Sequence, residues 1–76
     1  MKEEYEIHPN QLPNKKFSYQ KAFKYAKLME QGVEFPPVNI FVNYHRNNML
    51  DYNDGVHRVA AAKMTGKMLK IKRSKR

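Results

Sequence analysis

Cysteine is absent from this chain of 76 residues, which excludes disulfide bridges, zinc sites with Cys ligands and Cys nucleophiles. The N-terminus shows no secretory signal pattern, and no apolar run approaches the roughly 20 residues that span a bilayer. These absences favour a cytoplasmic protein that does not act at a membrane. Hydrophobic residues make up 41% of the chain, so we expect a single domain over residues 1–76 with a small core.

Acidic residues are also scarce, with 7 Asp and Glu against 15 Lys and Arg, and the formal charge is +8. A field of this sign attracts nucleic acid or nucleotides. Much of the surplus lies near the C-terminus, where we predict nucleic-acid contacts from Lys70, Lys72, Arg73, Lys75 and Arg76. The alternative is that residues 73–76 form only a solubilising or disordered tail, since no aromatic residue accompanies them.

The first half of the chain predicts a strand, a loop and a helix. Residues 5–7 read as a short strand that ends before Pro9, and a loop follows over residues 10–16. Ser18 is a plausible N-cap for a helix over residues 18–31, with Gly32 at its C-terminal end. One face of this helix is apolar and is interpreted as a stripe that packs in the core: Ala22, Phe23, Ala26 and Met29. A neighbouring face carries Lys21, Lys24 and Lys27, which we interpret as a solvated surface. Tyr19 and Tyr25 are interpreted as edge packing rather than as platforms for base stacking.

The second half predicts a hairpin, a helix and a last strand. Residues 38–44 alternate, which places Val38, Ile40, Val42 and Tyr44 on one face of a half-buried strand. An Asn-rich turn leads to a return arm over residues 49–52. A helix follows over residues 55–65, with Gly66 as its C-cap, and residues 68–72 alternate again. The order β–α–β–β–α–β predicts an α+β domain with a small mixed sheet and two main helices.

The start of the second helix is the most informative segment. Asn53 and Asp54 are turn formers, Gly55 follows them, and the helix then exposes unpaired N–H groups at a positive dipole end. We therefore predict a phosphate or nucleotide site formed by Asp54, Gly55, His57 and Arg58, with Arg58 adding a bidentate contact. The alternative is ordinary helix capping, in which Asp54 accepts hydrogen bonds from the N–H groups of the next turn.

The sequence gives weaker evidence for catalysis and for metal binding. Asp54 and His57 are the candidate catalytic pair, as base or acid beside a bound phosphate. The three histidines His8, His45 and His57 have no spacing that predicts a metal site. Asp51 and Asp54 could hold Mg²⁺ beside the phosphate of ATP or CTP, since that ion needs only one or two protein carboxylates. More often, one such residue is a cap and the other a turn residue.

The order of elements together with Asp54-Gly55-Val56-His57-Arg58 resembles the ParB/sulfiredoxin superfamily over nearly the whole chain. Two further segments resemble its opening strand and the segment leading into its second strand: Ile7-His8-Pro9 and Phe35-Pro36-Pro37-Val38-Asn39-Ile40. The resemblance implies this superfamily's fold. It also implies that the Gly turn and Arg58 hold nucleotide phosphates.

The chain differs from three branches of that superfamily: the sulfiredoxins, the ParB proteins and the free-serine kinases. Val56 stands where sulfiredoxins carry a catalytic Cys, so sulfinic acid reduction is excluded. Val56 and His57 replace part of the arginine-rich box of ParB proteins. Asn10 and Gln11 stand where the related free-serine kinases carry an acidic residue. No helix-turn-helix domain follows, so we expect a minimal version, a fragment or a subunit of a larger assembly.

Three functions follow from these residues. The first is a ParB-like module that binds nucleotide or DNA phosphates without strong catalysis. The second is an enzyme of the same fold, either a nuclease or a nucleotide-dependent phosphotransferase using Asp54 and His57. The third is a protein-interaction domain or homodimer that has lost the site, against which the retained Asp54, Gly55, His57 and Arg58 count.

Overall fold

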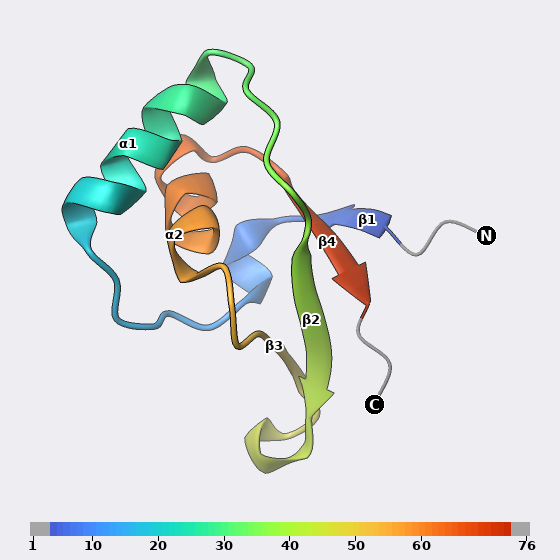
Figure 1. Ribbon diagram of the computed structural model, residues 1–76. Helices are drawn as coiled ribbons and strands as arrows, with labels where there is room; N and C mark the ends of the chain where they lie inside the picture. The colour runs from blue at the N-terminus through green and yellow to red at the C-terminus, as the bar shows by residue number, and fades with distance from the viewer. Residues whose placement is uncertain (1–3, 74–76) are drawn as a thin grey trace.

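A computed structural model describes residues 4–73 and has the predicted α+β order. The two helices and the four strands of one mixed sheet are drawn in Figure 1. Short 3-10 turns at Pro9–Gln11 and Tyr44–Arg46 add to the predicted elements. The bounds of the main elements are β1 Glu4–Ile7, α1 Tyr19–Glu30, β2 Val38–Asn43, β3 Met49–Asp51, α2 Val56–Thr65 and β4 Leu69–Arg73.

The sheet has the strand order β1-β4-β2-β3. The last strand, β4, lies between the first two strands, antiparallel to β1 and parallel to β2, and it aligns Ile71 with both Tyr5 and Val38. β2 and β3 form the predicted antiparallel hairpin. Figure 1 shows α2 between α1 and the strands, so α2 is the layer that joins the sheet to the outer helix.

Small residues let the two helices approach. Ala60, Ala61 and Ala62 of α2 are buried, and α1 buries Ala22 and Ala26. The interaxial distance between packed helices depends on the side chains at the contact, so alanines on both partners favour a close approach. The remaining core joins α2 to the sheet and to the loop before α1: Leu12, Val38, Ile40, Tyr52, Val59, Ala62, Leu69 and Ile71.

Fewer apolar side chains of the β2 and α1 segments are buried than the sequence predicts. Val42 is 42% exposed and Tyr44 is 83% exposed, and Tyr44 belongs to a 3-10 turn rather than to β2. Their predicted burial is wrong because the β2–β3 hairpin extends past the helices, and neither helix covers its tip in Figure 1. On α1, Phe23 is 46% exposed, so the helix buries a narrower stripe than predicted.

The ends of α1 follow the predicted positions with one difference. The helix begins after Ser18, but the Ser18 hydroxyl makes no capping hydrogen bond. Gly32 follows the last turn with a φ of +90°, as a glycine at a helix C-terminus commonly does. Neither α1 nor α2 is long and apolar enough to cross a membrane, a statement that holds for residues 4–73.

Candidate functional site

The turn before α2 has a backbone conformation that requires glycine. Gly55 is the N-cap of the helix and has a φ of +83°, a left-handed conformation that costs other residues about 1–2 kcal/mol. A Cβ at Gly55 would lie 3.1 Å from Val38 Cγ2 and 3.1 Å from Arg58 Nη2. Gly55 is therefore needed both for the turn and for the close approach of the Arg58 side chain.

No side chain caps α2. Asp54 Oδ1 accepts from the N–H of Gly55 at 3.0 Å, so the capping bond predicted from Asp54 to the next turn is not formed. The first intrahelical bond of α2 runs from Val59 N to Gly55 O, at 3.0 Å. The N–H groups of Val56, His57 and Arg58 precede that bond, and they lie at the positive end of the helix dipole.

Arg58 is held by the segment that leads into β2. Its Nη1 donates to Pro36 O at 2.7 Å and to Pro37 O at 3.3 Å. A guanidinium has five N–H donors, so the two bonds from Nη1 leave Nε and Nη2 beside Gly55. The sequence predicts an anion contact for Arg58 but does not predict these two backbone acceptors, which lie more than twenty positions earlier in the chain.

His57 points toward α1. Its Nε2 accepts from Ser18 N at 3.1 Å, and its ring meets the Tyr25 ring edge-on with 6.2 Å between centroids. Because Nε2 accepts this bond, it is the unprotonated nitrogen of the ring. The structure thus gives His57 a role in joining α2 to α1, and no hydrogen bond joins it to Asp54 within residues 4–73.

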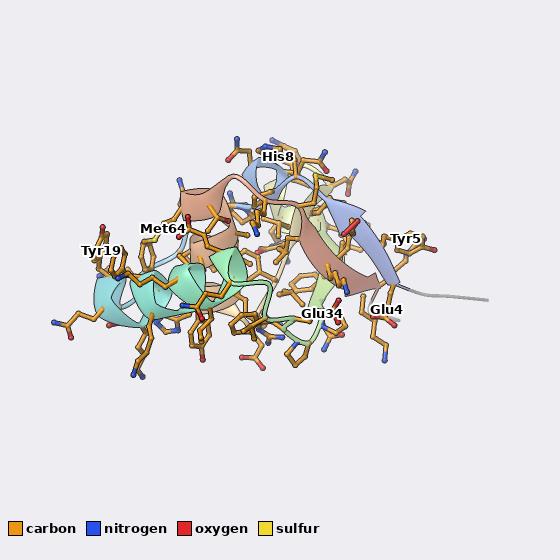
Figure 2. All side chains as sticks on the ribbon, turned by 90° about the horizontal axis from the view of Figure 1, so that it is seen from above. Glu4, Tyr5, His8, Tyr19, Glu34 and Met64 are labelled. Atoms are coloured by element: carbon orange, nitrogen blue, oxygen red, sulfur yellow. The ribbon has the colours of Figure 1, made fainter. Side chains whose placement is uncertain are left out.

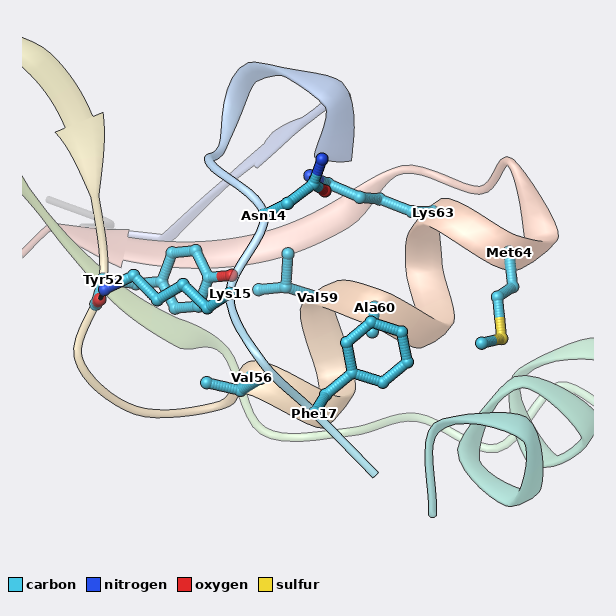
Figure 3. A pocket seen from close by; sticks show the side chains of 9 residues that line it. All are labelled: Asn14, Lys15, Phe17, Tyr52, Val56, Val59, Ala60, Lys63 and Met64. Atoms are coloured by element: carbon cyan, nitrogen blue, oxygen red, sulfur yellow. Dashed lines mark hydrogen bonds between the residues drawn. The ribbon is translucent and has the colours of Figure 1, made fainter. Parts of the chain in front are cut away.

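A cavity of about 230 Å³ lies beside the start of α2. Val56 belongs both to this wall and to the first turn of the helix, whereas the predicted site residues Asp54, Gly55, His57 and Arg58 do not line the cavity. Figure 3 shows the lining side chains, which come from α2, from Tyr52 and from the segment before α1: Asn14, Lys15, Phe17, Tyr52, Val56, Val59, Ala60, Lys63 and Met64. The wall is mostly apolar, and the ammonium groups of its two lysines have protein partners: Lys15 pairs with Asp51, and Lys63 donates to Leu12 O and Asn14 Oδ1.

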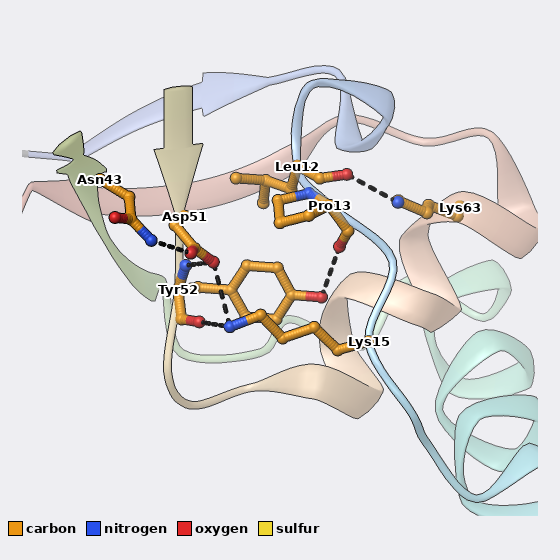
Figure 4. A network of polar contacts seen from close by, with 7 residues as sticks. All are labelled: Leu12, Pro13, Lys15, Asn43, Asp51, Tyr52 and Lys63. Atoms are coloured by element: carbon orange, nitrogen blue, oxygen red, sulfur yellow. Dashed lines mark hydrogen bonds and ion pairs between the residues drawn. The ribbon is translucent and has the colours of Figure 1, made fainter. Parts of the chain in front are cut away.

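A network centred on Asp51 fixes one side of that cavity (Figure 4). Asp51 Oδ1 accepts from Tyr52 N at 2.7 Å and pairs with Lys15 Nζ at 3.0 Å, while Oδ2 accepts from Asn43 Nδ2 at 2.7 Å. Burial raises the pKa of Asp51, but the hydrogen bonds and the charge of Lys15 outweigh it and bring the pKa below its ordinary value. Burial, and secondarily the charge of Asp51, raises the pKa of Tyr52.

The loop before α1 is tied down at three points. Lys63 Nζ donates to Leu12 O at 2.8 Å, Tyr52 Oη donates to Pro13 O at 2.8 Å, and Lys15 Nζ donates to Tyr52 O. Burial lowers the pKa of Lys63, which also donates to Asn14. Sequence reasoning did not find this network, because its members are distant in the chain and no local pattern links them.

The structure offers little for a metal. All three donors around Asp51 are protein groups, so pairing Asp51 with Asp54 around Mg²⁺ would require breaking the network. Asp54 itself is exposed. Residues 4–73 contain no group of three or more His, Cys, Asp or Glu side chains that could hold an ion.

Three of the predicted nucleic-acid contacts near the C-terminus, Lys70, Lys72 and Arg73, lie on β4. Lys70 Nζ pairs with Glu34 at 3.3 Å. In the sheet, Lys70 aligns with Glu6 and Lys72 aligns with Glu4, so acidic residues of β1 stand beside both lysines. Arg73 ends β4, and Lys75 and Arg76 lie outside the described residues.

Comparison with known proteins places the fold. No protein-family model matches the sequence, and no curated protein matches it. Among solved structures, the chain is similar to sulfiredoxin from Arabidopsis thaliana, with a TM-score of 0.75 over 96% of this chain and 85% of that chain. Only 14% of residues are identical, so the similarity concerns the fold alone. The chain therefore has the sulfiredoxin-like α+β fold.

Proposed function

We propose that this protein is a ParB-like module of sulfiredoxin-like fold that binds a nucleotide. The phosphates would lie at the start of α2 and the remainder of the ligand in the adjoining cavity. The observation that carries the proposal is the position of Val56, which lies in the uncapped first turn of α2 and also in the wall of an apolar cavity of about 230 Å³. A helix N-terminus suits a phosphate, and an apolar pocket with few polar groups suits a small organic ligand.

The electrostatics of the site support an anion. Arg58 lies against Gly55, and its Nε and Nη2 donors lie beside the turn. Lys15 and Lys63 also line the cavity, where Lys15 is neutralised by Asp51 and Lys63 is the cation without an acidic partner within residues 4–73. Asp54 is the acidic residue of the turn, and its carboxylate is engaged by the N–H of Gly55.

Binding without strong catalysis is the form of the proposal that the geometry favours. A general acid or base must reach the reacting atom. The Nε2 atom of His57 instead accepts from the backbone of Ser18, and Val56 occupies the position at which sulfiredoxins carry a catalytic Cys. Hydrolysis or phosphotransfer at this site would require His57 to leave α1.

The proposal is tested by an NMR titration with ATP, ADP, CTP and a short DNA duplex. We expect nucleotide-dependent shifts of the backbone amides of residues 55–58 and of cavity residues such as Val59. Arg58→Ala should weaken nucleotide binding by about 1.5–3 kcal/mol, the usual worth of a hydrogen bond to a charged group.

Arg46→Ala is the matched control, because Arg46 is an exposed arginine in the turn between β2 and β3. Thermal unfolding must be measured for both variants, since Arg58 also stabilises the segment leading into β2. Equal nucleotide affinity in wild type and Arg58→Ala would contradict the proposal and restrict Arg58 to that structural role. Shifts caused by the duplex but by no nucleotide would assign the site to DNA phosphates.

A further inference from the structure

The N-terminal half of α1 carries an exposed aromatic surface that the core does not use. Tyr19 is 64% exposed, so its interpretation from the sequence as edge packing is wrong. Phe23 is 46% exposed, and Phe17 just before the helix is 43% exposed. Tyr19 and Phe23 are one helical turn apart, and their rings are stacked, with 6.1 Å between centroids and 10° between planes. Figure 2 shows Tyr19 at the edge of the molecule, directed away from the sheet.

One lysine lies over these rings, and others are close in sequence. Lys27, one turn beyond Phe23, places its Nζ 5.1 Å from the centre of the Phe23 ring. Lys16, Lys21 and Lys24 are exposed on the same stretch. Residues 7–29 contain five lysines and no acidic residue, so no carboxylate of this segment offsets the charge beside the rings.

We infer that the surface formed by Phe17, Tyr19, Phe23, Lys24 and Lys27, here called the α1 platform, binds single-stranded nucleic acid. Bases stack on exposed aromatic rings whatever their sequence, and lysines beside the rings neutralise phosphates. The nearly parallel rings of Tyr19 and Phe23 present one common stacking direction. Lys27 covers part of the Phe23 ring, which leaves Tyr19 as the main open face.

The charges favour this occupant over others. A second copy of the chain would place lysines against lysines, which repel. A duplex keeps its bases stacked on one another inside, so it would use the lysines and leave the rings without partners. A single strand offers both unpaired bases and phosphates, and therefore matches both components of the α1 platform.

The test is fluorescence anisotropy with three labelled probes on the whole chain. The first is an unstructured thymidine strand of about 12 nucleotides, within the ~4–16 nucleotides that small single-strand-binding folds occupy. The second is an abasic strand of the same length and charge, and the third is a duplex. We expect the thymidine strand to bind about 5- to 100-fold more tightly than the abasic strand, which is the range for stacking of one base or more.

Variants locate the contact. Tyr19→Ala and Tyr19→Leu should weaken binding of the thymidine strand about 5- to 100-fold, and Tyr19→Phe should restore it. Tyr44→Ala is the matched control, because Tyr44 is 83% exposed on the distant β2–β3 turn and should have no effect. Lys24→Ala should reduce the slope of log K against log salt by about 0.7, the value per phosphate of a single strand. Tyr19 is exposed, so unchanged thermal unfolding of its variants should show that the fold is intact.

The α1 platform shares Phe17 with the cavity beside α2, but Tyr19, Phe23, Lys24 and Lys27 do not line that cavity. The two proposals can therefore be tested separately at Tyr19 and Arg58. Arg58→Ala should leave the affinity for the thymidine strand unchanged, and Tyr19→Ala should leave the ATP-induced shifts of residues 55–58 unchanged. Equal binding of the thymidine and abasic strands, or a preference for the duplex, would overturn the inference by reducing the interaction to charge alone. Binding that survives Tyr19→Leu but not Tyr19→Ala would also overturn it, because an apolar contact of the kind used by a protein partner would then suffice.

Discussion

Asp51 and Asp54 are three residues apart, yet they belong to two regions that differ in how fully their polar groups are hydrogen-bonded. The Asp51 network is closed: the Asp51 side chain is 6% exposed, and Lys15, Asn43 and the Tyr52 N–H supply its donors. The turn at Asp54 is open, because its side chain satisfies only the N–H of Gly55 and leaves the first turn of α2 uncapped. The first region contributes to stability, and the second leaves backbone N–H donors without a side-chain cap.

The largest effect should come from opening the closed region. Asp51→Ala should lower the free energy of unfolding by about 3–4 kcal/mol, because three donors lose their shared acceptor in a buried place. Chemical denaturation measures this loss. Asp54→Ala is the control and should change stability by about 0.5 kcal/mol or less. Similar losses in the two variants would remove the distinction between the regions.

The same network predicts a pH dependence. The folded-state pKa of Asp51 lies below its ordinary value of 3.8. Its contribution to stability should therefore be complete above pH 3.8 and disappear as the pH falls through the lower, folded-state pKa. Denaturation curves in acid should show a smaller loss of stability for Asp51→Asn than for the wild type. Parallel curves would mean that Asp51 titrates equally in the folded and unfolded chains.

A smaller loss is expected from the glycine of the open region. Gly55→Ala should destabilise the protein by about 2–3 kcal/mol, since the new Cβ adds a contact with Val38 and Arg58 to the strain of a positive φ. Gly66→Ala isolates the strain, because Gly66 has a φ of +72° with no atom within 4 Å of the added Cβ, and should cost about 1–2 kcal/mol. Urea unfolding of both variants makes the comparison. Equal losses would show that the turn yields to the added methyl.

Removing one hydroxyl from the closed region should cost less. Tyr52→Phe deletes the bond from Tyr52 Oη to Pro13 O and should lower stability by about 1 kcal/mol. Tyr44→Phe, which changes an exposed ring, should leave the unfolding midpoint unchanged. If Tyr52→Phe leaves the free energy of unfolding unchanged, water replaces the hydroxyl as the partner of Pro13 O.

The smallest effect on stability should accompany a gain in ligand affinity. Asp54→Asn removes a negative charge at the positive end of α2 and should change stability by about 0.5 kcal/mol or less. Relief of repulsion should strengthen ATP binding about 2- to 5-fold, the worth of one exposed charge at a helix end. Isothermal titration measures the affinity. A loss of affinity would instead mean that Asp54 positions the ligand or an accompanying ion.

Local patterns predicted the elements well and the partners poorly. Helical spacing located α1 and α2 to within a residue, because apolar periodicity and glycines at helix ends are local signals. The interpretation of Asp54 as a helix cap failed because Gly55 takes the N-cap position. The spacing of Asp51 and Asp54 left open whether they share an ion or serve as a cap and a turn residue, and it gave no sign that Asp51 is buried and Asp54 exposed.

The sequence by itself determined the order of elements, the turn at Gly55 and the basic, cysteine-free character of the chain, since each depends on residue type and short-range geometry. Only the tertiary structure decided that β4 lies between β1 and β2, that Arg58 meets the carbonyls of Pro36 and Pro37, and that His57 meets Ser18. Periodicity identifies which residues share a face. It does not identify which distant backbone group that face will meet, because this depends on how all the layers pack at once.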